Sequence, residues 1–262
     1  MLTDHTDSVC NAVEIGTAPI STLHVRNPFF SFSLPSDFQV FSTPFNRSLY
    51  HWPLAALRIQ TPRLELRPPD DGELAAVADV AARGIHLPDQ RPFLTPWTHL
   101  PPPERALYVI QQHWLTRGQW QPEAWTLELG VFHNGQPIGM VSLRGREFSI
   151  LREVKTGSWL GLEFQGQGLG TEARAALLRL AFAELGAVAA LSEVFQDNAA
   201  SQGVSRKLGY RWGGLSRDVL DGQPVVSDRL RLTREDWERN PQIPVTVTGL
   251  EPCRRFFLPE SD

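Results

Sequence analysis

The sequence of 262 residues lacks the features that identify metal centres, disulfide frameworks and membrane spans. Its two cysteines, Cys10 and Cys253, stand near opposite ends of the chain, and such sparse use indicates a reducing compartment. No CxxC pair or His/Cys cluster occurs, so we expect no metal site. No apolar run approaches the roughly 20 residues that a membrane-spanning helix needs, so we expect no membrane partner.

An excess of positive charge is also missing, because the formal net charge is -4. Without a basic field over the whole chain, nucleic acid is not an expected partner. The first ten residues, MLTDHTDSVC, are acidic where a secretory signal is basic, and no apolar core follows them. The sequence therefore predicts a cytoplasmic protein.

The composition divides the chain into three parts. Residues 1–53 mix Ser, Pro and Phe with few charges and no sustained period, which is typical of an N-terminal extension with little order. Residues 54–240 carry regular patterns and form the predicted domain. Residues 241–262 are expected to be an extended C-terminal tail.

Within the domain, strand and helix patterns alternate. Residues 57–68 alternate in polarity like one half-buried strand, and Asp70 with Glu73 forms a capping-box pattern that begins a helix over 71–84. A second helix is expected over 105–118, and Asn134-Gly135 predicts the turn of a hairpin over 124–145. Further strands, two helices and a closing hairpin follow to residue 233. This order predicts an α/β fold with three layers, α/β/α, around a mixed, mostly antiparallel central sheet.

Three glycines on alternate positions mark the most distinctive stretch, Gln165-Gly166-Gln167-Gly168-Leu169-Gly170-Thr171. It lies between a predicted strand and a predicted helix. The first N–H groups of a helix have no partners within it, and glycine lets a phosphate approach the backbone closely. The stretch therefore predicts a site for a phosphate or pyrophosphate.

Two well-known phosphate loops fit this stretch poorly. A nucleoside-triphosphate loop needs Lys and then Ser or Thr after its last glycine, whereas Thr171 and Glu172 follow Gly170. A dinucleotide loop needs the spacing GxGxxG early in its domain, although Glu193 stands where its ribose-binding acid is expected. The dinucleotide interpretation is the weaker of those that remain.

A second motif follows the glycine loop. It begins at Asn198 and Ser201 and ends in Lys207-Leu208-Gly209-Tyr210. Together the two motifs resemble the GCN5-related N-acetyltransferase (GNAT) superfamily, and within it the branch that acetylates the N-termini of ribosomal proteins. The loop of residues 165–170 matches the family pattern Q/R-x-x-G-x-G/A. The resemblance covers about residues 57–238 and implies the family's fold.

The resemblance also implies acetyl-CoA as co-substrate, bound by the glycine loop, by the end of the strand before it and by the asparagine of the second motif. The residues implied are Trp159, Leu160, Gln165, Gly166, Gln167, Gly168, Leu169, Gly170, Thr171 and Asn198. Asn198 can equally be a helix N-cap, and the two roles are compatible.

The catalytic residues are implied less directly. Many family members have a Tyr seven residues after the Asn as proton donor to the thiolate, but this chain has Ser205 there, so Ser201 is the predicted substitute. The branch often has a Glu four residues before the strand Trp, but this chain has Lys155 there. Glu153, on the same strand face, is the predicted base, with Glu193 as the alternative.

The sequence thus predicts an enzyme that moves an acetyl group from acetyl-CoA to a primary amine by direct attack in a ternary complex. The amine belongs to a protein N-terminus or to a small molecule. A non-catalytic acyl-CoA-binding module and a nucleotide-binding oxidoreductase are the alternatives. The oligomeric state is left open, with a homodimer as one option.

Overall fold

The computed structural model describes residues 47–258, all of which lie in one compact unit. Most of the predicted N-terminal extension, and Cys10 with it, lies outside the described residues. Residues from the end of that extension do fold, as the short helix α1 (Arg47–His51) and the 3-10 turn Pro53–Ala56. Leu54 in this turn is fully buried, so the folded part begins before residue 54.

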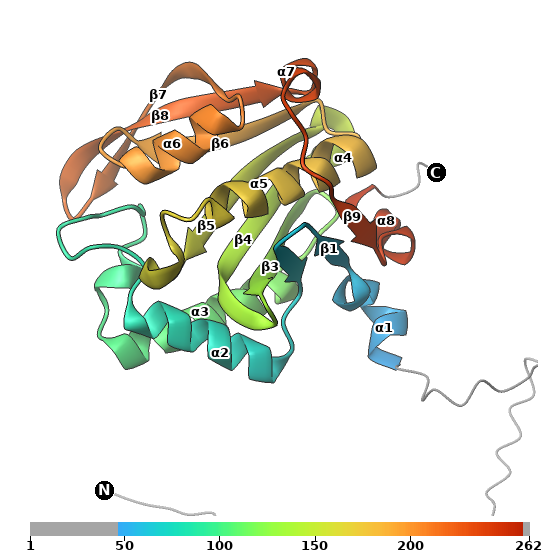
Figure 1. The fold of residues 1–262 in the computed structure, drawn as a ribbon, viewed down its shortest axis with the longest axis horizontal. Helices are drawn as coiled ribbons and strands as arrows, with labels where there is room; N and C mark the ends of the chain where they lie inside the picture. The colour runs from blue at the N-terminus through green and yellow to red at the C-terminus, as the bar shows by residue number, and fades with distance from the viewer. Residues whose placement is uncertain (1–46, 259–262) are drawn as a thin grey trace, which may run out of the picture. The chain divides into compact units, whose positions relative to one another are not determined.

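The described residues form one sheet with the strand order β7-β8-β6-β5-β4-β3-β2-β1-β9 (Figure 1). Only β5 and β6 pair in parallel, and every other neighbouring pair within these residues is antiparallel. The strands are β1 (Arg58–Gln60), β2 (Leu64–Arg67), β3 (Ala124–His133), β4 (Gln136–Arg146), β5 (Glu153–Leu160), β6 (Ala189–Phe195), β7 (Arg211–Leu220), β8 (Gln223–Thr233) and β9 (Thr246–Thr248). The predicted mixed, mostly antiparallel sheet is confirmed.

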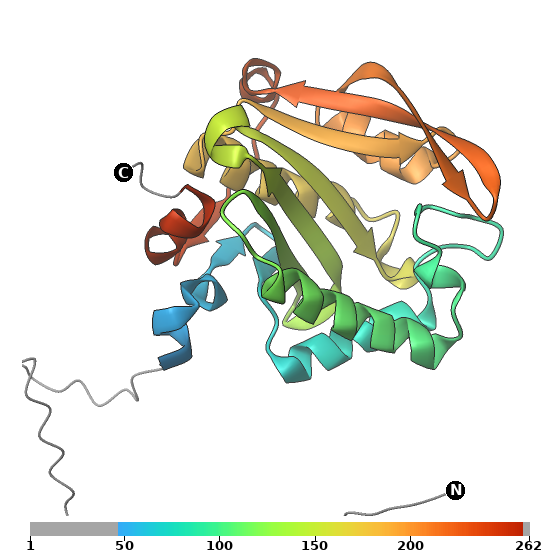
Figure 2. The same cartoon turned by 180° about the vertical axis from the view of Figure 1, so that it is seen from behind.

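Helices cover both faces of the sheet, as Figures 1 and 2 show from opposite sides. One face packs against α5, with Val141, Leu143 and Val154 in its core. The other packs against α2 and α3, with Met140 and Trp159 in its core. The helices are α2 (Asp71–Arg83), α3 (Pro102–Gly118), α4 (Phe148–Leu151), α5 (Leu169–Arg179), α6 (Ala199–Lys207), α7 (Arg234–Arg239) and α8 (Arg254–Phe257).

Local sequence signals explain where several elements begin and turn. The Asp70 side chain accepts from the Glu73 N–H at 2.8 Å and Glu73 bonds back to Asp70, so the predicted capping box is present. Asn134 and Gly135 have φ of 51° and 76°, the left-handed pair that the β3–β4 hairpin turn requires. Each of these features is formed by a few neighbouring residues, as its sequence pattern predicts.

Two segments differ from the sequence-based prediction. Residues 57–68 form two antiparallel strands, β1 and β2, rather than one. The chain reverses at Thr61-Pro62-Arg63, because Pro62 has no N–H for a ladder and the Thr61 N–H bonds to the Leu64 carbonyl at 2.9 Å.

The segment after residue 240, expected as an extended tail, also contributes to the domain. Its strand β9 pairs with β1 and becomes an edge of the sheet. After it, Cys253 and Phe257 are fully buried in the core cluster under α5. The domain described by the structure therefore continues to residue 258.

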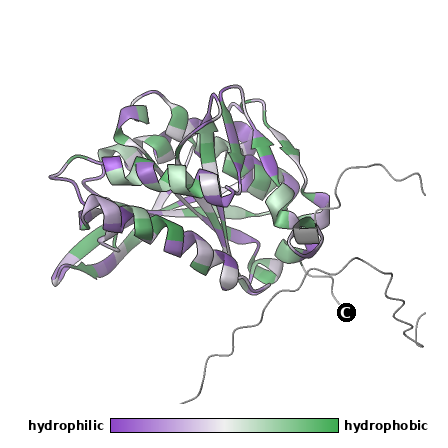
Figure 3. Ribbon diagram, turned by 90° about the horizontal axis from the view of Figure 1, so that it is seen from below, coloured by the Kyte–Doolittle hydropathy of each residue, from purple (hydrophilic) through white to green (hydrophobic). Residues whose placement is uncertain are grey.

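Hydrophobic and hydrophilic residues alternate along the same elements, as Figure 3 shows by colour. This pattern fits helices and strands that bury one side and expose the other. Within residues 47–258, no helix is both long enough and apolar enough to cross a bilayer.

Candidate active site

The glycine loop leads directly into α5 in a conformation that leaves the helix N-terminus open. Gly166 and Gly168 have φ of 73° and 78°, the left-handed region that favours glycine. Gly168 is the N-cap and provides no side-chain hydrogen bond to the helix. The first N–H groups of α5 are therefore not capped by a side chain, and they form the positive end of the helix dipole.

The loop is held in place by its own glutamine side chains, which donate to backbone carbonyls around it. The Gln165 amide donates to the Leu160 carbonyl at 2.9 Å and to the Ile85 carbonyl at 2.7 Å. The Gln165 N–H also bonds within the protein, to the Leu162 carbonyl at 3.2 Å. The structure thus uses the N–H groups of Gln165 to fix the loop against the end of β5. The side chain of Gln167 is exposed and donates to the Glu163 carbonyl at 3.0 Å.

A carboxylate in the first turn of α5 joins the helix to the β1–β2 turn. Glu172 accepts from the Thr61 hydroxyl at 2.7 Å, from the Arg63 N–H at 3.0 Å and from Arg63 Nε at 2.7 Å. Arg63 Nη1 also donates to the Gln167 carbonyl at 3.1 Å. Burial alone raises the pKa of Glu172, but these hydrogen bonds and the Arg63 charge outweigh it and hold the pKa below its usual value.

The strand before the loop separates from its parallel neighbour. β5 pairs with β6 only from Glu153↔Ala189 to Lys155↔Leu191. Beyond that point β5 stays bonded to β4 as far as Leu160, and β6 stays bonded to β8 as far as Phe195. The backbone of residues 156–160 therefore has a free edge toward β6. Figure 1 shows the two strands diverging toward the ends where α5 and α6 begin.

A buried polar cluster lies at the point where the strands part. Arg174 of α5 is 2% exposed, and its Nη2 donates to Thr156 Oγ1 at 2.9 Å and to Ser192 Oγ at 3.3 Å. Thr156 also shares a 3.0 Å hydrogen bond with the Tyr210 hydroxyl. No carboxylate pairs with Arg174 among the described residues, so hydroxyl groups and the face of the Tyr210 ring, whose centroid is 5.5 Å from Arg174 Cζ, surround this buried cation.

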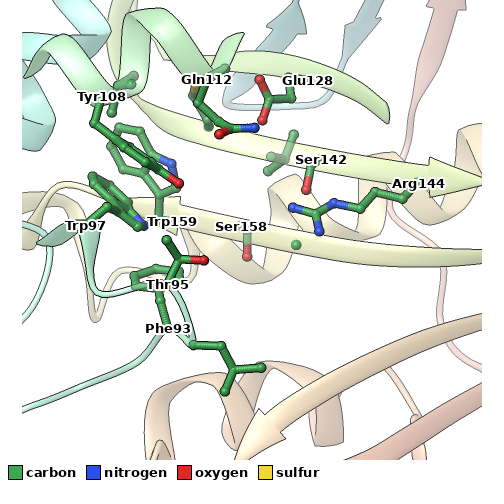
Figure 4. A pocket seen from close by; sticks show the side chains of 15 residues that line it. Phe93, Thr95, Trp97, Tyr108, Gln112, Glu128, Ser142, Arg144, Ser158 and Trp159 are labelled. Atoms are coloured by element: carbon green, nitrogen blue, oxygen red, sulfur yellow. The ribbon is translucent and has the colours of Figure 1, made fainter. Parts of the chain in front are cut away.

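The opposite face of β5 borders a cavity of about 390 Å³ (Figure 4). Trp97 stacks on Tyr108 at 5.3 Å between ring centroids and meets Trp159 edge-on at 5.9 Å, which makes one wall aromatic. Polar groups from the sheet line the rest, among them Glu128, Ser142 and Arg144. An apolar wall with a few convergent polar groups is typical of a small-molecule site.

The residues from the second motif lie at the start of α6. Asn198 is its N-cap, and its side-chain oxygen accepts from the Ser201 N–H at 3.0 Å. The N-cap role of Asn198 is therefore observed, and its role toward a cofactor stays a prediction. Ser205 is fully buried, and its hydroxyl has no hydrogen-bond partner among the described residues.

The two predicted base candidates are both paired with cations. Glu153 Oε1 lies 2.6 Å from Arg231 Nη2, and it borders a second hollow of about 550 Å³ near the beginning of β5. Glu193 pairs with the Lys155 ammonium group. Neither side chain lines the cavity beside Trp159.

Sequence reasoning missed two charged residues that the structure brings to this region, Glu128 and Arg174. Glu128 lies on β3 between Leu127 and Leu129, both buried, so a carboxylate within an apolar strand was the available signal. Arg174 interrupts the apolar face of α5 in the same way. No group of His, Cys, Asp and Glu suited to a metal ion occurs in residues 47–258.

Comparisons with known proteins agree with this geometry. Residues 63–211 match the family model described as an acetyltransferase (GNAT) domain. A curated protein named "Putative ribosomal N-acetyltransferase YdaF", from Bacillus subtilis (strain 168), is 31% identical over 116 residues. This match spans 43% of the chain and 62% of the relative, less than two thirds of its length.

Solved structures share the fold at lower identity. RimJ of Mycobacterium smegmatis, solved with CoA-disulfide, superposes with a TM-score of 0.60 and 19% identity, over 72% of this chain and 92% of RimJ. RimL, a ribosomal L7/L12 α-N-protein acetyltransferase solved with coenzyme A, gives a TM-score of 0.53 and 20% identity. That match covers 66% of this chain and 95% of RimL.

Proposed function

Because the chain belongs to the acetyltransferase (GNAT) domain family, we propose that it transfers an acetyl group from acetyl-CoA to a primary amine. The observation that carries the proposal is the separation of β5 from β6 beside the uncapped start of α5. It supplies a free strand edge and an anion-binding helix terminus next to each other, and a long cofactor with a pyrophosphate and two amides needs both.

On this proposal the glycine loop holds the pyrophosphate. Backbone N–H groups of residues 166–171 and the dipole of α5 would provide the attraction, while Gln165 keeps the loop against Leu160. The arm of the cofactor would run from there between β5 and β6 and pair with the free edge over residues 156–160. Asn198 lies across the gap at the start of α6, and its amide NH₂ would donate to the arm.

The amine would approach from the other face of β5, through the cavity beside Trp159. This arrangement brings donor and acceptor to opposite sides of the same strand and allows direct attack in a ternary complex. The names of the relatives favour a protein N-terminus as acceptor, whereas the aromatic wall also suits a small aromatic amine. A cytoplasmic location, as the sequence predicts, would provide acetyl-CoA.

Calorimetric titration with acetyl-CoA and with NAD tests the donor site. We expect micromolar binding of acetyl-CoA and none of NAD. Binding of NAD alone would support the oxidoreductase alternative, and no binding of acetyl-CoA would contradict both the enzyme and the acyl-CoA module.

A charge variant tests whether the glycine loop binds the pyrophosphate without disturbing the rest of the fold. Gln167→Glu adds a carboxylate at an exposed position beside the helix N-terminus, where it favours the helix but repels a pyrophosphate. We expect acetyl-CoA affinity to fall about tenfold or more, as a loss of ~1.4 kcal/mol implies. The matched control, Gln223→Glu at the exposed first residue of β8, is expected to bind as the parent does. Equal affinity in both variants would contradict the loop assignment.

Release of the CoA thiol over a panel of amines separates an enzyme from a binding module. The panel contains short peptides that begin with Ser, Ala, Thr or Met, together with phenethylamine as a small aromatic amine. Turnover of any member supports transfer. Tight binding of acetyl-CoA without turnover of a broadened panel would support the non-catalytic module.

A further inference from the structure

A row of three residues crosses the sheet from the floor of the cavity to the gap between β5 and β6. Glu128 on β3 pairs with Ser142 on β4, and Ser142 pairs with Gly157 on β5. Residues directly opposite each other in a sheet point to the same face, with Cα atoms about 5 Å apart. All three line the cavity, so this row connects the cavity to β5 on the acceptor side.

The β5 end of the row lies just past the point where the two strands part. The last β5–β6 pair is Lys155↔Leu191, two residues before Gly157. A Cβ at position 157 would lie 2.7 Å from Ser142 Oγ. Because Gly157 has no side chain, the Ser142 hydroxyl can lie close to the backbone of β5. A thioester held in the gap would therefore lie next to a hydroxyl that reaches it from the cavity side.

The carboxylate of Glu128 differs from the other acids of the region because no Arg or Lys pairs with it in the described part of the chain. It accepts from the Thr116 hydroxyl at 3.0 Å, and His113 Nδ1 lies 3.4 Å from it. Its side chain is 14% exposed. A carboxylate that is nearly buried, hydrogen-bonded and without a fixed cation is available to attract an ammonium group.

Other ionisable groups surround this carboxylate on the elements packed against it. His113 and Tyr108 face it from α3. Arg144 lies on β4, two residues after Ser142 and on the same face of the sheet. Burial raises the pKa of Tyr108, the negative charge of Glu128 raises it further, and Arg144 partly offsets the shift. The Tyr108 hydroxyl therefore stays protonated beside Glu128 and can donate a hydrogen bond.

We propose that Glu128 is the base that deprotonates the acceptor amine, and that Ser142 bridges the two over Gly157. This inference rests on the proposed function. The ammonium gives one proton through the Ser142 hydroxyl to Glu128, and the nitrogen lone pair then forms a bond to the thioester carbon. As the C–S bond breaks, the second proton passes from nitrogen to sulfur. The products are the amide and the CoA thiol, and Glu128 returns its proton to water.

Glu153, the base predicted from the sequence, is placed less well for this step. It lies four residues before Gly157 on β5, about 13 Å along the strand, and it is paired with Arg231. It also borders the second hollow rather than the cavity that Ser142 and Gly157 line. The two assignments therefore make opposite predictions for the two carboxylates.

The test compares amide variants of three carboxylates in the full chain, with phenethylamine and the Ser peptide as probe amines. We expect Glu128→Gln to lower kcat/KM about 100-fold or more near pH 7, as removal of a general base does, with acetyl-CoA affinity within twofold of the parent. Because only the free amine can then react, kcat/KM of the variant should keep rising with pH as the ammonium group of the probe amine loses its proton. Glu65→Gln, a half-exposed acid on β2, is the matched control and should match the parent in both measurements.

Two further variants keep the test decisive if Glu128→Gln folds poorly. Glu128→Asp retains a carboxylate and should recover part of the lost kcat/KM near pH 7. Ser142→Ala should lower kcat about tenfold without changing acetyl-CoA affinity, because it removes only the bridge. A parent-like rate in folded Glu128→Gln, or a larger loss in Glu153→Gln, would overturn the proposal. Failure of the parent protein to bind acetyl-CoA would instead overturn the proposed function.

Discussion

The carboxylate of Glu172 offers a direct test of how the glycine loop is held. It ties the first turn of α5 to Thr61 and Arg63 in the β1–β2 turn, and Arg63 also bonds to the Gln167 carbonyl. Glu172→Gln keeps the shape of the side chain but replaces one carboxylate oxygen with an NH₂ group. The perturbation therefore removes a charged pair and leaves the packing almost unchanged.

The contacts of Glu172 set how much the substitution should lower the free energy of unfolding. One oxygen accepts from the Thr61 hydroxyl and the Arg63 N–H, and a glutamine oxygen can keep both bonds. The other oxygen accepts from Arg63 Nε at 2.7 Å and lies 2.6 Å from Nη2, and this pair is lost. Hydrogen bonds to charged groups contribute roughly 1.5–3 kcal/mol. Because the Arg63 side chain is 44% exposed, we expect a smaller loss of about 1–2 kcal/mol.

The unfolding free energy that the variant loses should be larger at neutral pH than in acid. The pKa of Glu172 is lower in the folded protein than in the unfolded chain, so its contribution is fully present above the unfolded value of about 4.3. That contribution disappears as the pH falls through the folded pKa. The gap in unfolding free energy between parent and variant should therefore be widest near neutral pH and should narrow in acid.

Urea unfolding at several pH values measures this gap, and acetyl-CoA titration reports on the loop. The control is Glu163→Gln in the same region, since Glu163 pairs with Arg83 at 3.2 Å and both side chains are well exposed. We expect the control to change stability by less than about 0.5 kcal/mol. Glu172→Gln should also bind acetyl-CoA a few-fold more weakly, because the freed guanidinium no longer fixes the loop. A gap that is equal in acid and at neutral pH, or no larger than that of the control, would show that the Glu172–Arg63 pair does not stabilise the fold.

Three further predictions concern the buried polar cluster, the buried thiol and the second motif. Thr156→Val should cost about 1–3 kcal/mol in urea unfolding, because Arg174 loses its 2.9 Å acceptor while the volume hardly changes; a neutral result would contradict the role given to the cluster. In a Cys10→Ser background, Cys253 should not react with a thiol reagent near pH 8 until the protein unfolds, since burial raises its pKa to about 11. Ser201→Ala should lower turnover of the probe amines less than about threefold, and a loss as large as that of Glu128→Gln would instead support Ser201 as the acid, as the sequence predicts.

Features with short-range causes were predictable from the sequence. The capping box at Asp70, the turn at Asn134-Gly135 and the left-handed glycines of the loop each depend on a few consecutive residues. The family resemblance extended these signals to a fold, and the sheet and its single parallel pair agree with it.

Features that depend on distant residues were not predictable in this way. The strand β9 has three residues, too few to show an alternating pattern, and it forms because β1 lies beside it. The pairing of Glu153 with Arg231 joins residues 78 positions apart. The row that contains Glu128 becomes visible only when the register of β3, β4 and β5 is known, since nothing in the local sequence aligns Glu128 with Gly157.

The buried position of Ser205 bears on how the thiolate is handled. The resemblance implies a tyrosine acid at this position, but the Ser205 side chain is enclosed in the protein and its hydroxyl has no partner among the described residues. A thiol with a pKa near 8.5 leaves readily as thiolate at neutral pH, so it needs little help from an acid. The harder task is to remove a proton from an ammonium group, whose pKa is about 8 at a protein N-terminus and near 10 in an alkylamine such as the lysine side chain. A chain without the tyrosine can therefore retain transfer if it keeps a base on the acceptor side, and Glu128 occupies that side of the strand.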